Sequence, residues 1–423
     1  MRTVRRQLKV LLSAYACQPN RGSEPGVGWN TACDLARHHD VWVLTCAHNR
    51  SGIEAVDPRS LPSGLHFVYH DLWSLPETWN PDDNKLACEV HYYTWQVSAY
   101  LKARRLHREV EFDLVNHVTY VRYWMPSLMA LLPIPFVLGP VGGGETAPSG
   151  FHEDLEGTAR HFEKLRDAAR WIGEHDPFVR RSVRGSHVAL STTRQTAARL
   201  RHMGARRVDL LGECGLRRSE VDQLGDLAAP PARPLRFISV GRLLHWKGVH
   251  LGLRAFAQAH LPEAVYWIVG DGPWRDRLQA EARALGIGDR VRFWGRLPRS
   301  EAMEKLAASH ALVHPSLHDS GGWVCLEAMA ARRPVLCLDL GGPAYQVTSR
   351  TGIKIPPRSP EQVVRELSEA MHALAHDPDR RRRLGQNGHR RVLDRFLWKH
   401  KTETLLRIYD SVTRTEGETA HVL

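Results

Sequence analysis

Two acids, Asp319 and Glu327, stand eight positions apart around a glycine pair in the stretch HDSGGWVCLEAMA. The pattern predicts that a strand, ALVHPS, leads into the loop LHDSGG and then into the helix WVCLEAMAARR. Asp319 would lie on the loop and Glu327 about one turn inside the helix, so both carboxylates would face one cleft. Gly321 and Gly322 would let backbone amides approach a ligand closely. Carboxylates bind vicinal hydroxyls, so we expect a ribose at one acid and a sugar at the other; the alternatives are a helix N-cap for Asp319 and a solvated position for Glu327.

A second loop carries two cations. In SVGRLLHWKG, Gly241 ends a predicted strand, and Arg242 and Lys247 flank a short loop before a helix that begins near Gly248. Two cations beside a helix N-terminus form a site for a diphosphate, because their charge-assisted bonds add to free backbone amides and the helix dipole. The alternative is a pair of solvated surface cations. The loop is not a Walker loop, because it lacks the GKS or GKT ending.

These loops belong to a repeating pattern of short β-branched runs and longer amphipathic stretches. Runs such as LKVLLSAYA, DVWVLTC and PFVLGPV in the first half, and LRFISVG, VYWIVGD and PVLCLDL in the second, predict buried strands. Alternation of such strands with helices is typical of parallel sheets with crossover helices. We therefore predict an α/β protein with two doubly wound, Rossmann-like domains facing each other across a cleft, where ligands bind beyond the carboxyl ends of the strands.

The chain length and one pattern-poor stretch predict where the domains divide. A chain of 423 residues fits two domains. The stretch DQLGDLAAPPARP is rich in proline and alanine and reads as a linker. We predict a first domain over residues 1–212, a linker over 213–234 and a second domain over 235–395.

Composition and charge narrow the class of protein. Apolar residues form 43% of the chain and charged residues 25%, as in soluble globular proteins, and no stretch approaches the roughly 20 apolar residues of a membrane span. The formal net charge of +12 suggests three kinds of partner: nucleic acid, an anionic membrane or an anionic substrate. Basic stretches such as FVRRSVRGS indicate either solvated helix faces or membrane contact. No zinc-finger spacing or aromatic RNA-binding box accompanies the charge, so no nucleic-acid partner is expected.

The first residues imitate a signal peptide, with basic residues ahead of an apolar patch. That patch is only as long as a strand and is interrupted by Ser13, so we assign residues 9–16 to the first strand. The seven cysteines are odd in number and show no paired short spacing, which favours a reduced, cytoplasmic setting.

Five elements in order resemble the retaining, GT-B fold glycosyltransferases of family 4. They are SVGRLLHWKG, WIVGDGPWRDRL, VRFWGRL, the stretch from ALVHPS to LDLGG, and the terminal RFLWKHKTETLLRIYDSV. The similarity is strong from Leu235 onward and looser before it. It implies a transferase that moves a sugar from a nucleoside diphosphate sugar to a hydroxyl of a glycan or lipid-linked acceptor. It also implies that the last helix, over residues 396–412, packs back onto the first domain.

The resemblance assigns donor-binding roles to individual residues. Arg242 and Lys247 would hold the donor diphosphate, with Gly22 of the loop GSEPGVG beside the phosphates. Glu327 would bind the nucleotide ribose, and Asp319 would lie by the donor sugar as a catalytic candidate. Asp319 is one methylene shorter than the usual Glu of the family, and Ser-Gly-Gly replaces the usual Gly-Phe-Gly, so the donor sugar stays open. Contacts to the donor sugar or base are assigned to Gly241, Gly321, Gly322 and Arg296.

The first domain of this family holds the acceptor and often a histidine near the reaction centre. His117 in FDLVNHVTY is the catalytic candidate there, with Asn116 and Val118 as alternative alignments and a structural role as the alternative for His117. Glu24 and Glu145 are candidates on the acceptor side. The alternative for Glu145 is an acid at a helix N-terminus.

No cofactor and no essential metal are expected. The sequence DPD at 377–379 has the spacing of metal-dependent transferases of another fold, but it directly precedes RRRRLGQNG, so helix capping explains it better. Arg242, Lys247 and helix dipoles would stabilise the departing diphosphate instead. The family suggests bacterial surface or exopolysaccharide synthesis, in the cytoplasm or at the inner face of the plasma membrane. The alternative is a GT-B nucleotide-binding or scaffold protein with little or no turnover.

Overall fold

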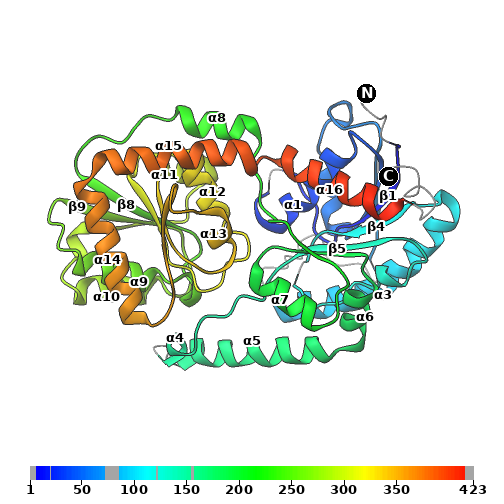
Figure 1. The fold of residues 1–423 in the computed structure, drawn as a ribbon, viewed down its shortest axis with the longest axis horizontal. Coiled ribbons are helices and arrows are strands. Elements are labelled where there is room, and N and C mark those ends of the chain that lie inside the picture. The colour runs from blue at the N-terminus through cyan, green and yellow to red at the C-terminus, as the bar shows by residue number, and fades with distance from the viewer. Residues whose placement is uncertain (1–5, 20, 72–84, 121, 154–156, 415–423) are drawn as a thin grey trace, which may run out of the picture. The chain divides into compact units, whose positions relative to one another are not determined.

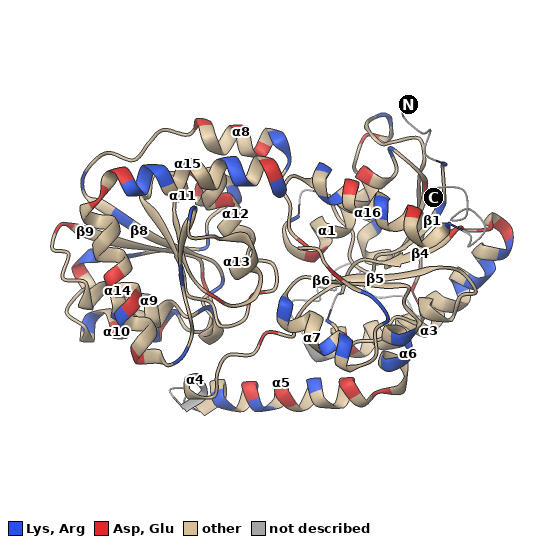
Figure 2. Cartoon of the chain, viewed as in Figure 1, with Lys and Arg blue, Asp and Glu red and all other residues tan. Residues whose placement is uncertain are grey.

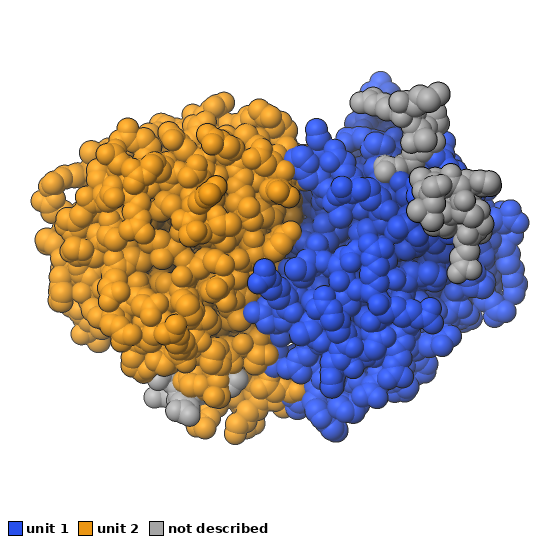
Figure 3. Space-filling model, in the orientation of Figure 1, with its two compact units in different colours: residues 1–144, 168–213, 398–423 blue, residues 145–167, 214–397 orange. Residues whose placement is uncertain are grey.

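The computed structural model describes residues 6–19, 21–71, 85–120, 122–153 and 157–414. The chain forms two compact units, coloured separately in Figure 3. Unit 1 contains Met1–Gly144, Ala168–Glu213 and Trp398–Leu423, and unit 2 contains Glu145–Asp167 and Cys214–Leu397. Each unit is built on one parallel sheet with helices around it (Figure 1). The predicted α/β class with two Rossmann-like domains is therefore confirmed.

Unit 1 has a seven-stranded sheet in the order β3-β2-β1-β4-β5-β6-β7. Its strands are β1 (Lys9–Ser13), β2 (Asp40–Thr45), β3 (Leu65–Tyr69), β4 (Leu114–His117), β5 (Phe136–Val141), β6 (Val188–Ser191) and β7 (Val208–Leu210). Its helices are α1 (Ser23–Leu35), α2 (Arg50–Glu54), α3 (Lys85–Val110), α6 (Pro177–Gly185), α7 (Arg194–His202) and α16 (Trp398–Thr413). Helix α16 is tied to the sheet, because the Tyr409 hydroxyl donates to Asn116 Oδ1 at 2.7 Å.

Unit 2 has a six-stranded sheet in the order β10-β9-β8-β11-β12-β13. Its strands are β8 (Leu235–Val240), β9 (Ala264–Val269), β10 (Val291–Gly295), β11 (Ala311–His314), β12 (Val335–Leu338) and β13 (Gly352–Ile355). Its helices are α8 (Arg218–Asp226), α9 (Val249–Gln258), α10 (Arg275–Ala284), α11 (Arg299–Ala307), α12 (Trp323–Ala330), α13 (Gly341–Gln346), α14 (Pro360–His376) and α15 (Pro378–Arg395). In both sheets the first strand lies in the interior, and the order of winding reverses beside it, between β1 and β4 and between β8 and β11.

The sheet of unit 2 is buried on both faces, and neighbouring strand residues show why. Phe237 of β8 packs in the core under α9 and α14, whereas the next residue, Ile238, packs in the core under α8, α12 and α15. Ala311 and Leu312 of β11 divide between the same two cores. Because successive side chains of a strand point to opposite faces, a strand covered by helices on both sides must be apolar throughout. This accounts for the continuous apolar runs in the sequence.

The units differ from the predicted domains in the segment 145–167 and in the linker. Residues 145–167 precede β6 in the sequence, yet they belong to unit 2. The segment contains α4 (Gly150–Glu153) and the first part of α5 (Gly157–His175). Ala147 and Phe151 are buried in the same core as Phe237. The predicted linker, residues 213–234, differs as well, because Arg218–Asp226 within it form α8.

Candidate functional site

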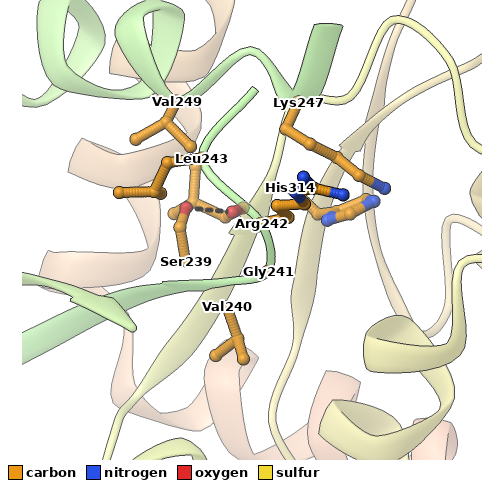
Figure 4. Close-up of a pocket in the computed structure, with 9 residues that line it drawn as sticks. Ser239, Val240, Gly241, Arg242, Leu243, Lys247, Val249 and His314 are labelled. Atoms are coloured by element: carbon orange, nitrogen blue, oxygen red, sulfur yellow. Dashed lines mark hydrogen bonds between the residues drawn. The ribbon is translucent and has the colours of Figure 1, made fainter. Parts of the chain in front are cut away.

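The loop after β8 places two cations at the carboxyl edge of the sheet. Arg242 and Lys247 line a small pocket together with Ser239, Gly241 and His314. Figure 4 shows Lys247 and His314 extending to the same side of this pocket. The loop ends in a short 3-10 turn, His245–Lys247, and α9 begins at Val249. The strand, loop and helix thus follow the predicted order.

Glycine is required where this loop meets the loop after β11. Gly248 adopts the left-handed conformation (φ +67°), and a Cβ there would lie 2.0 Å from the Pro315 carbonyl oxygen. Gly322 is also left-handed (φ +62°), and it forms the N-cap of α12. Residues other than glycine rarely adopt this conformation. The close approach of the two loops depends on Gly248, whereas a Cβ at Gly322 would lie 2.9 Å from Pro343 Cγ.

Asp319 joins the two loops. Its Oδ2 lies 2.7 Å from Lys247 Nζ and 2.9 Å from His314 Nε2, and its Oδ1 accepts a hydrogen bond from the Gly322 amide at 2.7 Å. Burial raises the pKa of the Asp319 carboxyl, but Lys247 and His314 outweigh it, so the net pKa lies well below its ordinary value. Asp319 is therefore ionised and held in one orientation by the predicted diphosphate ligand Lys247.

The Lys247–Asp319 pair lies where a doubly wound sheet binds ligands. Strands β8 and β11 are adjacent and parallel, with Phe237 beside Ala311 and Ile238 beside Leu312. The loops that follow them flank the point at which the winding reverses. Such a switch point, at the carboxyl ends of the strands, is the usual ligand site of this kind of sheet.

Glu327 is buried in α12, one turn after its start. Its Oε1 lies 2.8 Å from Arg299 Nη2, and the same nitrogen lies 3.2 Å from Glu220 Oε1. Burial raises the pKa of Glu327; Arg299 opposes this shift and Glu220 adds to it. An acid held in this way has a fixed orientation, which suits recognition of vicinal hydroxyls. Of the other predicted donor residues, Gly321 and Gly322 lie on the Asp319 loop, and Arg296 is exposed directly after β10.

The candidates from the first part of the sequence lie in different surroundings. Gly22 is exposed and is the N-cap residue of α1, and Glu24 is partly buried in the first turn of that helix. Glu145 belongs to unit 2 and is 1% exposed. Its Oε2 accepts a hydrogen bond from the Ser320 hydroxyl at 3.1 Å. Glu145 is thus brought to the Asp319 loop.

His117 lies at the end of β4 and is 2% exposed. Its Nδ1 lies 3.3 Å from Ser13 Oγ and its Nε2 3.2 Å from the Tyr92 hydroxyl. Burial lowers the pKa of His117 to about 4, so the ring is neutral at pH 7. The alternative alignment, Asn116, donates to the carbonyl oxygens of Val137 and Gly139 at 3.0 Å each and is thereby fixed as a structural residue.

Four residues of this region were missed by the sequence interpretation. His314 contacts Asp319, and the side chains of His245 and His318 contact Glu163. The three histidines stand inside the quoted motifs, so their position was a usable signal. Glu163 lies 82 residues before His245, and no local pattern marked it.

One cluster in the described residues has the side chains of a metal site: Cys46, Asp71 and His91, whose candidate ligand atoms lie within 4.8 Å of one another. The Cys46 thiol, however, donates to Asp71 at 2.7 Å, and His91 Nδ1 lies 2.7 Å from the Tyr15 hydroxyl. Cys46 and Asp71 are therefore hydrogen-bond partners of each other, whereas His91 is held by Tyr15. The DPD sequence has the predicted role, because the Asp377 side chain caps α15 by accepting from the Arg380 amide at 2.7 Å.

Comparison with known proteins agrees with this geometry. Residues 228–391 match the family model "Glycosyl transferases group 1". The chain is 32% identical over 232 residues to 2-deoxystreptamine N-acetyl-D-glucosaminyltransferase of Streptomyces fradiae, a match that covers 52% of this chain and 54% of that protein. It is 31% identical over 180 residues to the lipopolysaccharide core biosynthesis glycosyltransferase LpsD of Rhizobium meliloti, covering 43% and 50%. The chain thus spans about half the length of the curated relatives it matches.

Solved structures extend the likeness in fold to nearly the whole chain. Sucrose-phosphate synthase from Thermosynechococcus elongatus superposes with a TM-score of 0.65 at 20% identity, covering 96% of this chain and 99% of that one. Anabaena Alr3699/HepE, solved in complex with UDP, superposes with a TM-score of 0.61 at 16% identity, covering 96% and 100%. Both units have the parallel, doubly wound sheets of GT-B glycosyltransferases, and the family match falls on the unit that carries Arg242, Lys247 and Asp319. The family match thus lies within unit 2, and the likeness over the rest of the chain is one of fold.

Proposed function

We propose that this chain is a retaining glycosyltransferase that moves a sugar from a nucleoside diphosphate sugar to a hydroxyl of a glycan or lipid-linked acceptor. The observation that carries the proposal is the Lys247–Asp319 pair, which joins the loops after two adjacent parallel strands. A cation suited to a diphosphate and a carboxylate suited to sugar hydroxyls are thereby fixed 2.7 Å apart. The likeness to 2-deoxystreptamine N-acetyl-D-glucosaminyltransferase and to the lipopolysaccharide core biosynthesis glycosyltransferase LpsD supports the reaction class.

The reaction proceeds by exchange of one C–O bond for another. The bond between the anomeric carbon and the β-phosphate oxygen breaks, and the electron pair leaves with the nucleoside diphosphate. The acceptor hydroxyl oxygen forms the new bond on the same face of the sugar, and its proton passes to the departing phosphate oxygen. Arg242, Lys247 and the N-terminus of α9 stabilise the charge that develops on the leaving group, so the reaction needs no metal ion.

Donor hydrolysis and transfer test the proposal. The full chain is incubated with UDP-glucose, UDP-N-acetylglucosamine, GDP-mannose and ADP-glucose, first without and then with simple glycan acceptors, and release of the nucleoside diphosphate is followed. NMR of the product gives the anomeric configuration. Nucleotide release with a product of the same configuration as the donor supports the proposal, whereas inversion contradicts the retaining mechanism. No release from any donor favours a binding or scaffold protein.

We also propose a cytoplasmic location with peripheral contact to an anionic membrane through unit 1. None of the helices in the described residues is long and apolar enough to cross a bilayer. Arginines gather on α6 (Figure 2), and Arg181, Arg184 and Arg206 line a surface pocket of about 480 Å³. Phe178, which is 49% exposed, is the second residue of the same helix. An aromatic side chain beside several cations suits an anionic lipid surface.

Vesicle sedimentation tests this contact. The chain should bind phosphatidylglycerol vesicles at low salt, not phosphatidylcholine vesicles, and Arg181→Glu should weaken the binding. Equal binding to both lipids, or none to either, would contradict the membrane proposal. Binding to duplex DNA of similar strength would contradict the expectation that no nucleic acid is a partner.

A further inference from the structure

The segment 145–167 packs against the predicted donor loops of unit 2. Phe162 stacks on Trp246, with ring centroids 5.1 Å apart and an angle of 12° between the planes. Trp246 stands directly before Lys247. Its carbonyl oxygen accepts a hydrogen bond from the Leu317 amide at 2.7 Å, in the loop that carries Asp319. A segment that comes from the first half of the sequence therefore supports the diphosphate loop of the second half.

Glu163 connects the segment to both loops at once. Its Oε1 lies 2.8 Å from His245 Nε2, and its Oε2 lies 2.9 Å from His318 Nε2. The carboxylate is 3% exposed. His245 stands two residues before Lys247, and His318 is the neighbour of Asp319. One buried carboxylate thus spans the two loops that meet in the Lys247–Asp319 pair.

The chemistry of this bridge keeps it in place. Burial raises the pKa of Glu163, but His245 and His318 lower it by more, so the carboxyl is ionised. A carboxylate only accepts hydrogen bonds, so each imidazole turns its Nε2–H toward it. Glu145 lies on the other side of this ring, because its backbone oxygen is 3.2 Å from His318 Nδ1. Both ring nitrogens of His318 therefore face residues of one segment.

We propose that Glu163 is a positioning residue of the donor site, which sets the distance between the diphosphate loop and the Asp319 loop. This inference rests on the function proposed above, because it assigns the consequence to donor binding. Glu163 acts through His245 and His318. Without its carboxylate the two loops lose their common anchor, and Lys247 and Asp319 are no longer fixed relative to each other. Nucleotide affinity should fall even in protein that remains fully folded.

The matched pair of variants is Glu163→Gln and Lys164→Gln. Glu163→Gln keeps the shape of the side chain but replaces one carboxylate oxygen by an NH2 group. One of the two imidazole N–H groups then faces a donor instead of an acceptor. Lys164 is the exposed neighbour on the same helix and serves as the control. UDP, GDP and ADP are titrated against each full-length variant by calorimetry, and the folded fraction is measured by circular dichroism. E163Q should lower the affinity for the nucleotide that binds best by about tenfold, which is within the range of coupling energies measured between residues in contact. K164Q should bind this nucleotide with the affinity of the wild type.

A double-mutant cycle separates positioning from a general loss of stability. In a His245→Gln, His318→Gln background Glu163 no longer links the two loops through imidazoles, although Arg166 Nη1 stays 3.8 Å from its Oε2, so E163Q should cause little further loss of affinity. If E163Q does not fold, Glu163→Asp carries the test. Its shorter side chain keeps the charge but cannot reach both imidazoles, and it should also weaken binding.

The outcomes distinguish the inference from the proposed function. A wild-type chain that binds none of the three nucleotides overturns both. A wild-type chain that binds one of them, with E163Q and E163D binding equally well, overturns the role of Glu163 alone. A lower unfolding temperature in E163Q with unchanged affinity likewise assigns Glu163 to stability and contradicts positioning.

Discussion

The two winding-reversal points of this molecule carry different side-chain contacts. In unit 2, between β8 and β11, the contacts are made by buried carboxylates: Asp319 meets Lys247, and Glu163 meets two imidazoles. In unit 1, between β1 and β4, the buried His117 ring meets the hydroxyls of Ser13 and Tyr92. The same sheet topology therefore places ionised carboxylates at one reversal point and a neutral imidazole beside hydroxyls at the other.

This difference indicates that an anionic ligand should bind to unit 2. A lysine paired with a carboxylate can also bind a phosphate, because carboxylate and phosphate oxygens both accept hydrogen bonds from the same ammonium group. A neutral imidazole enclosed by hydroxyls has no charge to offer. We therefore expect changes at the β8 and β11 loops of unit 2 to act on donor binding, and changes at His117 of unit 1 to act mainly on stability.

The largest effect is expected from Lys247→Ala. Loss of this cation should lower donor turnover about a hundredfold, because a group that stabilises developing charge on a leaving group contributes on that scale. The matched control is Lys354→Ala, since Lys354 Nζ lies 2.8 Å from Asp339 in a comparable ion pair on β13 of the same unit. Steady-state kinetics with the best donor checks both variants. Equal losses in the two would mean that the charged network serves the fold and not the donor.

A smaller effect, about tenfold in nucleotide affinity, is expected from Glu327→Gln, which removes one charge-assisted hydrogen bond to a ribose hydroxyl. Glu220→Gln is its control, because Glu220 contacts the same Arg299 nitrogen. Calorimetric titration of the nucleoside diphosphate measures both. If Glu220→Gln weakens binding as much as Glu327→Gln does, the role of Glu327 is to hold Arg299 and not the ribose.

Acid should destabilise both units through their neutral histidines. Burial lowers the pKa of His117 from 6.5 to about 4 and that of His250 from 6.5 to about 3. Below pH 6.5 the unfolded chain therefore binds more protons than the folded chain, so the free energy of unfolding falls as the pH falls toward these lower values. We expect a loss of at least about 1 kcal/mol between pH 7 and pH 5, since one pKa unit corresponds to about 1.4 kcal/mol.

Urea unfolding at several pH values measures this slope. His250→Gln should reduce it, whereas His38→Gln, at an exposed position, should leave it unchanged. An unfolding free energy that stays constant from pH 7 to pH 5 would show that these rings are not neutral in the folded chain.

The smallest effect is expected from a chelator. If Arg242, Lys247 and the N-terminus of α9 stabilise the leaving diphosphate, EDTA should leave donor turnover unchanged. Loss of turnover that Mg²⁺ or Mn²⁺ restores would contradict the metal-independent reaction. The same assay with the Cys46→Ser variant would show whether the cluster of Cys46, Asp71 and His91 holds such an ion.

The fold could be predicted from the sequence where the pattern is local. The β8 loop and the β11 loop each carry strand, glycine, charge and helix within about twenty residues, so both were predicted in the observed order. The strands β7 and β13 were not predicted, because they lie at the edges of their sheets, where continuous burial is not required and the apolar run is weaker.

The contacts of Glu163 could not be predicted from the sequence. Its helix, α5, has several acids, and which of them becomes buried depends on packing against a loop 82 residues away. For the same reason residues 145–167 belong to unit 2, although their position in the sequence predicted that they belong to the first domain. His314 and His318 were within the quoted motif, but their contacts with Asp319 and Glu163 depend on where the loops fold in space.

The most direct test of the central claim is calorimetric titration of UDP, GDP and ADP against the wild-type chain, Arg242→Ala and Lys354→Ala. Arg242 lines the predicted donor pocket, whereas Lys354 lies in an ion pair on β13. We predict that one nucleoside diphosphate binds the wild type and Lys354→Ala equally and binds Arg242→Ala at least about tenfold more weakly, as expected for loss of a charge-assisted contact. Binding of no nucleotide, or equal binding to all three proteins, would contradict the assignment of the β8 and β11 loops as the donor site.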